Sequence, residues 1–324
     1  MSDIGAVVIG RNEGDKLQLC LNSLVSRINY LVYVDSGSTD QSIELAHSLE
    51  VEVVELDVSI PFTAARARNA GFERLMELND ALIFVQFVDG DCEVVEDWIQ
   101  VASDFLDENS GVAVVCGRRR ERYPNCSVYN HLCDIEWNTP IGESRACGGD
   151  AMIRILALRQ VGGFREDLVA GEEPELCLRL RQQGWLVWRL DADMTFHDAA
   201  IMKFGQWWKR TVRTGYAYAE GSYLHGAGPE RHWVRETRRA WFWGLVIPAA
   251  TLLLCGIWSY WGSVLLVLYP LQSARIYLKA GGRPRSRLLQ AFFLVLGKFP
   301  EMIGAMRFQF DRISGSASTL IEYK

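Results

Sequence analysis

The chain has 324 residues, about twice the length of a common single domain, so we expect one large domain with an appendage or two domains. Hydrophobic residues make up 49% and charged residues 23%, which excludes a disordered, collagen-like or disulfide-scaffold protein. The eight cysteines form no C-x2-C pair and no Cys/His metal cluster in the sequence, so we expect reduced thiols that face the cytosol.

The net charge of -6 hides an uneven distribution of charge along the chain. Residues up to His197 include 17 Lys and Arg against 33 Asp and Glu, whereas the remainder includes 17 against 7. A basic, apolar C-terminal part beside an acidic N-terminal part favours a catalytic or binding domain followed by a segment that meets an anionic membrane surface. Because the basic residues flank apolar runs and form no polar stripe, we expect no nucleic acid partner.

In the first half of the chain, short β-rich runs alternate with helical patterns, which predicts a series of βαβ units. Predicted strands cover 6–9, 30–34, 51–56, 81–88 and 112–116, and predicted helices cover 16–25, 41–49, 64–78 and 98–106. The strands are apolar on both faces, so we expect an α/β fold whose mainly parallel sheet carries helices on both faces. The first apolar run begins close to the start of the sequence, and we expect no signal peptide.

Acidic residues follow two of the predicted strands, at the edge of the sheet where such folds bind ligands. The second strand ends at Asp35, in the run Asp-Ser-Gly-Ser-Thr-Asp, which is either a capped turn or a ligand loop. The fourth strand ends in Asp89-Gly-Asp91. Carboxylates that emerge together from a buried strand repel one another, so a hard divalent cation explains them more economically than a solvated turn.

Two further elements are predicted before residue 200. Pro174 fits the first turn of a helix, which places Glu172 and Glu173 at the helix N-terminus. The two glutamates are either catalytic or ordinary acidic residues at a helix start. Residues 185–190 predict a strand that leads to His197.

The C-terminal hundred residues are predicted to associate with a membrane. Residues 241–258 and 260–277 form two apolar stretches of 18 residues each. Basic residues flank the pair on both sides and its connection is uncharged and aromatic, which is typical of a transmembrane hairpin with basic ends in the cytoplasm. Pro248 and Pro270 also allow a re-entrant or interfacial pair. Residues 288–310 predict an amphipathic helix that lies in the membrane interface.

Taken together, the motifs resemble those of the family 2 glycosyltransferases with a GT-A fold. The matching runs are Val8-Ile-Gly-Arg-Asn-Glu13, Val34-Asp-Ser-Gly-Ser-Thr-Asp40, Ala67-Arg-Asn-Ala-Gly71, Asp89-Gly-Asp91, Gly148-Gly-Asp150 with Val161-Gly-Gly-Phe164, and Gly171-Glu-Glu173. They appear in the family's order between about residues 4 and 200. Two positions depart from the family pattern: Ser36 and Glu173 each stand where the family has an Asp.

The resemblance implies a metal-dependent, inverting transfer of a sugar from a nucleotide-sugar donor to a hydroxyl of a glycan or lipid-linked acceptor, in cell-surface or exopolysaccharide synthesis. It implies that Glu173, or else Glu172, removes the proton of the acceptor hydroxyl. Asp91 and His197 are the implied ligands of Mg or Mn. Contacts with the donor are implied for Glu13, Asp35, Arg68 and Asp89, and contacts with the acceptor or sugar for Gly149 and Asp150.

We therefore expect a GT-A domain over residues 1–225 and a helical region over residues 226–324, which contains the hairpin at 241–277. This organisation predicts an enzyme on the cytoplasmic face of the cell membrane, with membrane lipid as a further partner. Two other functions stay open: a processive polysaccharide synthase, suggested by Gln206-Trp-Trp-Lys-Arg210, and a non-catalytic membrane-bound scaffold that binds sugar nucleotides. A dinucleotide-binding oxidoreductase is disfavoured, because G-x-G-x-x-G is missing after the first strand.

Overall fold

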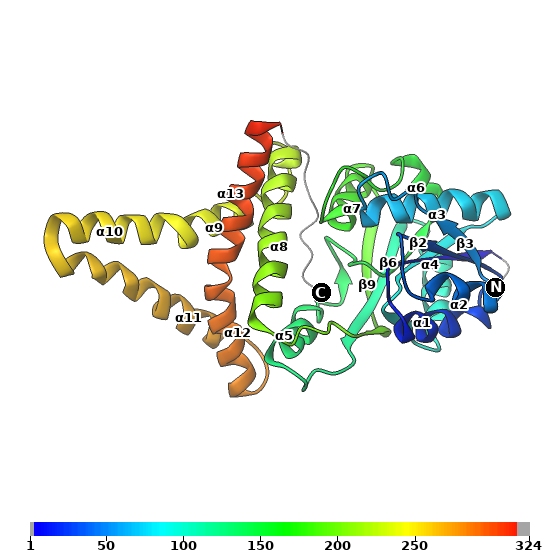
Figure 1. Cartoon of the computed structure of the whole chain (residues 1–324), viewed down its shortest axis with the longest axis horizontal. Coiled ribbons are helices and arrows are strands. Elements are labelled where there is room, and N and C mark those ends of the chain that lie inside the picture. The colour runs from blue at the N-terminus through cyan, green and yellow to red at the C-terminus, as the bar shows by residue number, and fades with distance from the viewer. Residues whose placement is uncertain (1–2, 316–324) are drawn as a thin grey trace. The chain divides into compact units, whose positions relative to one another are not determined.

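The computed structural model describes residues 3–315, and the chain divides into two compact units (Figure 1). The first unit runs to Pro124 and resumes over Cys133–Ala199. The second unit contains Asn125–Leu132 and the chain from Ala200 onwards. The expected division at residue 225 coincides with the end of α8 (Phe204–His225), and this helix packs against α13 (Lys298–Ser314) within the second unit.

A mixed sheet of nine strands forms the centre of the first unit. The strands are β1 (Ile4–Gly10), β2 (Tyr30–Asp35), β3 (Glu52–Glu55), β4 (Phe84–Asp89), β5 (Cys92–Val94), β6 (Val112–Glu121), β7 (Gly142–Glu143), β8 (Ala151–Arg154) and β9 (Leu186–His197). Their spatial order is β3-β2-β1-β4-β8-β6-β9-β5, and β7 pairs with β9. Strand β1 pairs in parallel with β2 and β4, and β2 pairs in parallel with β3, which confirms the predicted βαβ series. Strand β8 runs antiparallel to both of its neighbours, β4 and β6.

Helices cover both faces of this sheet, as its apolar strands predict. They are α1 (Asp15–Val25), α2 (Ser42–Ser48), α3 (Ala64–Leu78), α4 (Trp98–Glu108), α5 (Val128–Glu136), α6 (Ile155–Gln160) and α7 (Glu172–Gln182). Figure 1 shows α1 and α2 on one face and α3, α6 and α7 on the other. The start of α3 is as predicted because the Thr63 hydroxyl accepts a hydrogen bond from the Arg66 backbone N–H, at 3.1 Å.

Close packing of α3 on the sheet depends on Gly71. A Cβ atom at this position would lie 2.4 Å from Val7 Cγ1 and 2.7 Å from Val34 Cγ2, so a larger residue would push the helix away. Arg68 lies less than one helical turn before Gly71. The close approach therefore fixes the position of Arg68 relative to the strands.

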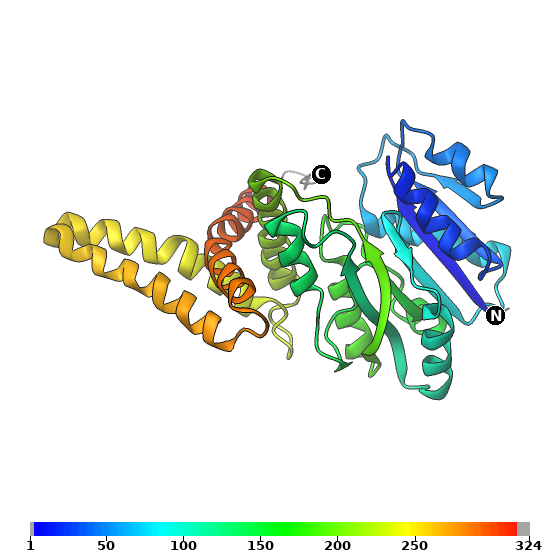
Figure 2. The same cartoon turned by 90° about the horizontal axis from the view of Figure 1, so that it is seen from below.

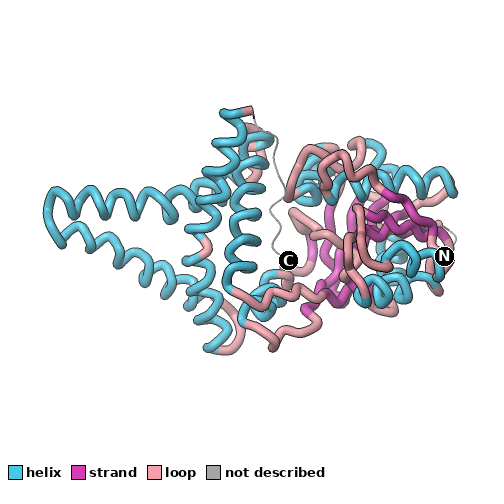
Figure 3. The backbone as a smooth tube through the Cα atoms, in the orientation of Figure 1, coloured by secondary structure: helices cyan, strands magenta, loops and turns pink. Residues whose placement is uncertain are grey.

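The second unit consists of helices in the part of the chain that the structure describes (Figure 3). Besides α8 and α13, they are α9 (Val234–Trp241), α10 (Ile247–Trp258), α11 (Leu268–Lys279) and α12 (Pro284–Leu296). A π-helical turn at Phe242–Val246 joins α9 to α10, and a 3-10 segment at Ser259–Val267 joins α10 to α11. The stretch expected to form one amphipathic helix contains two, because α12 and α13 meet at Gly297.

The backbones of α8 and α13 pack against each other without intervening side chains. A Cβ atom at Gly304 would lie 2.0 Å from the Val212 carbonyl oxygen, and one at Gly215 would lie 2.0 Å from the Glu301 carbonyl oxygen. Glycine at both positions permits this approach. Beside the crossing, buried apolar residues of both helices form a small core of the second unit's own.

A segment that contains the first five residues of α5 also belongs to the second unit. Within Asn125–Leu132, the ring of Tyr129 stacks on Trp207 of α8 with centroids 6.4 Å apart. The same ring meets Phe293 of α12 edge-on at 5.7 Å. The second unit is therefore assembled from two separate parts of the sequence.

Exposed apolar side chains concentrate on α10 and α11, which extend away from α8 and α13 within the second unit (Figure 2). On α10, Leu252 is 75% exposed, Leu253 66% and Ile257 62%. Two helical stretches, Val234–Lys279 and Pro284–Ser314, are long and apolar enough to cross a membrane, judged by length and composition alone. An exposed apolar surface of this kind favours membrane association.

Candidate active site

The two glutamates at the start of α7 have different surroundings. Glu172 has a side chain that is 8% exposed, and its Oε1 lies 2.6 Å from Arg68 Nη1. Glu173 forms no ion pair or side-chain hydrogen bond with another described residue. Burial, reinforced by the Glu172 carboxylate, raises the pKa of Glu173 to about 7. Glu172 is therefore paired with Arg68, whereas Glu173 can exchange a proton near neutral pH.

Arg68 joins the start of α7 to the end of β4. Its Nη2 lies 2.8 Å from Asp89 Oδ1 and donates to the Gly149 carbonyl oxygen at 3.3 Å. Although burial opposes its charge, Asp89 and Glu172 raise the pKa of Arg68 above its ordinary value. A buried charge with partners on both sides has little freedom to move, so Arg68 sets the spacing between α7 and the Asp89-Gly-Asp91 segment.

A second arginine, Arg119 on β6, holds the other oxygen of Asp89. Arg119 Nη2 lies 3.0 Å from Asp89 Oδ2 and 2.9 Å from Asp150 Oδ2. Although burial opposes ionisation, the two arginines hold the pKa of Asp89 below its usual value. Asp89 is therefore an anion whose two oxygens are both engaged.

Asp150 supports this network from the inside. Its side chain is fully buried, and it accepts hydrogen bonds from the Asp89 backbone N–H at 2.9 Å and from the Thr195 hydroxyl at 2.7 Å. We expected Asp150 to contact the acceptor or sugar. Complete burial favours instead a role in positioning Asp89 and Arg119.

Gly149 occupies a position where no side chain fits. A Cβ atom there would lie 2.5 Å from Asp89 Oδ2 and 2.9 Å from Arg119 Nη2. The absence of a side chain allows the Gly149 carbonyl to reach Arg68. Its contact with the acceptor or sugar stays a prediction.

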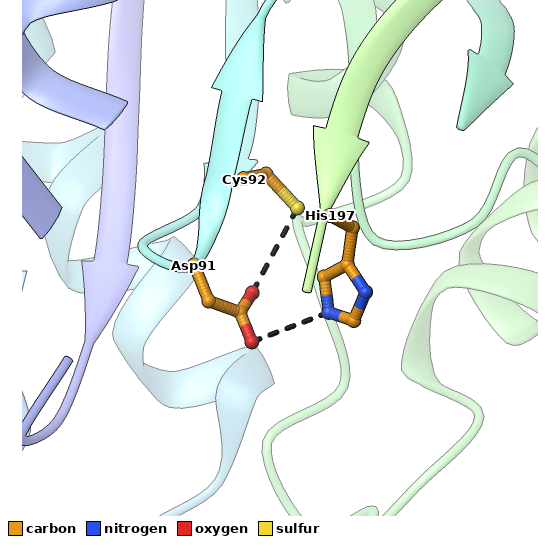
Figure 4. Close-up of side chains that lie close together, drawn as sticks. All are labelled: Asp91, Cys92 and His197. Atoms are coloured by element: carbon orange, nitrogen blue, oxygen red, sulfur yellow. Dashed lines mark hydrogen bonds and ion pairs between the residues drawn. The ribbon is translucent and has the colours of Figure 1, made fainter. Parts of the chain in front are cut away.

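Three potential metal ligands meet where β4, β5 and β9 end or begin (Figure 4). Asp91 follows β4, and its Oδ2 lies 3.2 Å from His197 Nε2 at the end of β9. Cys92 pairs with His197 across the β5–β9 ladder, and its sulfur lies 3.7 Å from Asp91 Oδ1. A carboxylate oxygen suits Mg²⁺ or Mn²⁺, whereas an imidazole nitrogen suits transition-metal ions and a thiol is a softer ligand still. Asp91 and His197, the two expected ligands, can therefore bind a divalent cation together, and the imidazole favours Mn²⁺ over Mg²⁺.

A second group of potential metal ligands shares Cys92 and consists of Asp89, Cys92 and Asp150. Both oxygens of Asp89 already face arginines, and Asp150 is fully buried. Asp91 with His197 is therefore the better candidate.

The loops after β1 and β2 contain the two remaining candidate donor contacts, Glu13 and Asp35. The Asp35 carboxylate accepts hydrogen bonds from the Tyr33 hydroxyl and the Gly37 backbone N–H at 2.9 Å, and from the Ser38 backbone N–H at 2.7 Å. These contacts shape the turn after β2, as in the alternative of a capped turn. Glu13 lies beside this edge of the sheet, with its Cγ 3.4 Å from where a Cβ atom of Gly90 would lie. Donor contacts of both acids stay predictions.

Sequence reasoning did not identify Arg119, Thr195 or Cys92 as members of this site. Arg119 is the middle one of three consecutive arginines on β6, and Thr195 lies two residues before His197 on β9. The signal that was available is the position of these residues on strands: Arg119 and Thr195 lie near the ends of β6 and β9, and Cys92 begins β5 directly after the Asp89-Gly-Asp91 loop. A strand residue beside a predicted ligand is a candidate for its support.

Comparison with known proteins shows what this chain is similar to. Residues 6–150 match the family model for glycosyl transferase family 2. The chain is also 28% identical over 196 residues to the succinoglycan biosynthesis protein ExoA of Rhizobium meliloti. That alignment covers 57% of this chain and 58% of the relative, so the chain matches less than two thirds of the relative's length.

Two solved structures share the fold over most of the chain. The mannosyltransferase PcManGT from Pyrobaculum calidifontis, in complex with GDP-Man and Mn²⁺, has a TM-score of 0.61 at 16% identity and covers 96% of this chain and 88% of its own. S. aureus TarS 1–349 has a TM-score of 0.52 at 14% identity and covers 94% of this chain and 91% of its own. At such identities the likeness shows the fold alone.

The motifs, the family match and these folds agree. The chain therefore contains a domain, residues 6–150, that matches glycosyl transferase family 2, and it shares the GT-A fold of the two solved structures.

Proposed function

We propose that this protein is a metal-dependent, inverting glycosyltransferase that moves a sugar from a nucleotide-sugar donor to a hydroxyl of a glycan or lipid-linked acceptor. The observation that carries the proposal is the difference between the surroundings of the two glutamates at the start of α7. Glu172 is paired with Arg68, whereas Glu173 has no such partner and a pKa of about 7. A general base works best when its pKa lies near the working pH.

Inversion follows from a single displacement at the anomeric carbon. Glu173 accepts the proton of the acceptor hydroxyl as the oxygen attacks, and the nucleoside diphosphate leaves from the opposite side. Covalent catalysis would need a second nucleophile beside the donor site. The nearest carboxylates, on Asp89 and Glu172, are engaged with arginines, which disfavours them in that role.

Asp91 and His197 would hold the cation, Mg or Mn, and Asp89 would lie next to the donor. A bound cation neutralises the charge of the diphosphate leaving group. The chemistry of the two side chains supports this assignment, as does the Mn²⁺ in the PcManGT complex. Arg68 and Arg119 keep Asp89 ionised and fixed, which preserves the shape of the donor side of the site.

Membrane attachment through α10 and α11 is the second part of the proposal. Basic residues flank the apolar hairpin on both sides, which favours the cytoplasmic face, where nucleotide sugars are made. The name of the relative ExoA supports a role in exopolysaccharide synthesis. We keep residues 1–225 and 226–324 as the proposed functional division, with α8 as the helix that also packs into the second unit.

A processive synthase and a non-catalytic scaffold are the alternatives. The Gln206-Trp-Trp-Lys-Arg210 run, the only feature that suggested processivity, lies on α8, where Trp207 packs on Phe293 with centroids 5.0 Å apart. This packing explains the aromatic residues without a bound polymer. A scaffold would have no need of a carboxylate with a raised pKa or of an Asp–His pair that can bind a metal.

The experiment is release of nucleoside diphosphate from a panel of sugar nucleotides by the full-length chain in membranes, with and without chelator. We expect one donor to be used, dependence on Mg or Mn, and a product whose anomeric configuration is opposite to that of the donor by NMR. Retention of configuration would contradict the mechanism. Equal release in excess chelator would contradict the metal assignment, and a panel without any turnover would favour the scaffold.

A further inference from the structure

The second unit contains a cavity of about 270 Å³ whose walls are strongly basic. It is lined by the basic residues Arg235, Arg239, Arg275, Lys279 and Lys298, and by Trp243, Gln272, Ile276, Leu294 and Val295. No acidic residue is among them. The cavity therefore combines a high positive charge with apolar walls.

Helical spacing explains how so many cations reach one cavity. On α11, Gln272, Arg275, Ile276 and Lys279 are three or four residues apart, so they share one face of the helix. On α9, Arg235 and Arg239 are four residues apart and also share a face. Two helices that are well separated in sequence thus present their basic faces to the same space.

Most of these cations lack a counter-charge within the protein. Among residues 3–315, Arg235, Arg239, Arg275 and Lys279 form no ion pair and no side-chain hydrogen bond. Lys298 is neutralised by Glu301, with Lys298 Nζ 2.8 Å from Glu301 Oε1. Four unpaired cations around a small cavity repel one another, and an anion would relieve that repulsion.

The surroundings of the cavity indicate that the anion has an apolar part. Trp243, Ile276 and Leu294 provide apolar walls, and α11 continues from the cavity into the exposed apolar hairpin. Basic residues at the ends of an apolar hairpin lie at the depth of lipid headgroups when the hairpin enters a bilayer. An inorganic anion would use the charge of this cavity but would have no need of the apolar walls.

We propose that this cavity binds the phosphate-bearing headgroup of a membrane lipid, with the hydrocarbon chains along α10 and α11. Two sources share this chemistry: a lipid-linked diphosphate and an ordinary anionic phospholipid. Four unpaired cations exceed what one phosphodiester neutralises, which favours the diphosphate. The inference concerns binding alone, so it does not depend on the proposed sugar transfer.

The test is flotation of the full-length chain with vesicles of phosphatidylcholine alone, of phosphatidylcholine with phosphatidylglycerol, or of phosphatidylcholine with a long-chain prenyl diphosphate. The cavity variant carries Arg275→Gln and Lys279→Gln. The control variant carries Arg283→Gln and Arg285→Gln, which removes the same charge from exposed residues outside the cavity. All four side chains are exposed, so neither variant removes a packed core residue.

We expect the cavity variant to bind the two kinds of anionic vesicle about tenfold more weakly than the control variant, because charge-assisted hydrogen bonds are lost. A preference for the prenyl diphosphate assigns the lipid-linked source, and equal loss on both kinds of anionic vesicle assigns ordinary phospholipid. Equal binding by the two variants would overturn the proposal, since diffuse attraction does not distinguish them.

Inorganic pyrophosphate serves as a soluble competitor in the same assay. We expect it to compete far more weakly than lipid, and competition as strong as that of the prenyl diphosphate would show a free-phosphate site instead. Sugar transfer by a chain whose binding is independent of the cavity would contradict this inference alone. Cavity-dependent binding by a chain that transfers no sugar would contradict the proposed function alone.

Discussion

The two units handle apolar surface and charge in opposite ways. In the first unit, helices cover both faces of the sheet, and the buried charges of Arg68, Arg119 and Asp150 all have partners. In the second unit, the apolar residues of α10 are exposed, and four of the five cations around the cavity form no ion pair with a described residue. The average hydropathy of the chain, near the soluble range, therefore conceals two different surfaces. The surface of the first unit is suited to water, and that of the second unit is suited to a bilayer.

The largest difference between the functions of the two units is expected when one of the proposed metal ligands is removed. Asp91→Asn should lower turnover about a thousandfold, since a cation that neutralises the leaving group contributes several kcal/mol to the transition state. Vesicle flotation of this variant should equal that of the parent chain. The measurement is nucleoside diphosphate release with Mg or Mn titrated; activity restored to the parent level without metal would contradict the assignment.

The next largest effect on the turnover rate is expected at the two glutamates, Glu172 and Glu173. Glu173→Gln keeps the shape of the side chain but removes the base, so the turnover rate should fall about a hundredfold or more while donor affinity changes little. Glu172→Gln should slow turnover less and should weaken the site through Arg68, which loses a charged partner. Steady-state kinetics of both variants decide the assignment: if Glu172→Gln is the slower enzyme, Glu172 is the base.

The exposed face of α10 should control attachment to the membrane. Replacing Leu252, Leu253 and Ile257 together by Ser should reduce partition into vesicles roughly a hundredfold, if each side chain contributes about 0.9 kcal/mol, less than full burial would give. Leu156→Ser provides a control, because Leu156 is 67% exposed on the first unit. Flotation of each variant is the measurement. Unchanged partition of the triple variant would mean that this face meets protein and not lipid.

The pH dependence of turnover should report Glu173. Because the base acts when deprotonated, and burial raises its pKa to about 7, turnover should rise with pH through this value. Below it, the rate should fall about tenfold for each pH unit. A pH–rate profile of kcat tests this, and the residual activity of Glu173→Gln should lack the same step. A profile that is flat between pH 5 and 8 in the parent chain would contradict it.

The smallest expected effect concerns the crossing of α8 and α13. Gly304→Ala places a methyl group 2.0 Å from the Val212 carbonyl, and overpacking of this kind costs about 1–3 kcal/mol. Gly256→Ala is a matched control, because a Cβ atom at Gly256 meets nothing within 4 Å. Thermal unfolding should show a lower midpoint for the first variant only. Equal midpoints would mean that the helices separate without strain.

Much of the first unit could be predicted because its strands and helices carry their own local signals. The bounds of α3 agree with the prediction at both ends, and Thr63 caps its start. The acids of the site were found for the same reason, since Asp89 and Asp91 directly follow a predicted strand. Local patterns of this kind reveal where a side chain leaves the sheet.

The supporting arginine could not be predicted because alternation fails along β6. Register shifts lie between Cys116 and Arg118 and between Arg118 and Arg119. As a result, the side chains of Arg118 and Arg119 are 16% and 15% exposed, and only that of Arg120 is turned outward, at 47%. A bulge depends on the partner strand, which is β9, some 70 residues away. The basic cavity could not be predicted from the sequence for a similar reason, since its residues on α9 and α11 come together only in the folded unit.

The segment around Tyr129 has a consequence for the order in which the protein forms during synthesis. Tyr129 emerges from the ribosome long before its partners Trp207 and Phe293 exist. At about 5–20 residues per second, the wait for Phe293 is on the order of 10 to 30 seconds. Until Trp207 is synthesised, about halfway through that interval, the aromatic ring has neither of these partners on the nascent chain. The contacts of this early segment are thus among the last to form. The nascent chain must keep the Tyr129 ring from other apolar surfaces until α12 is synthesised.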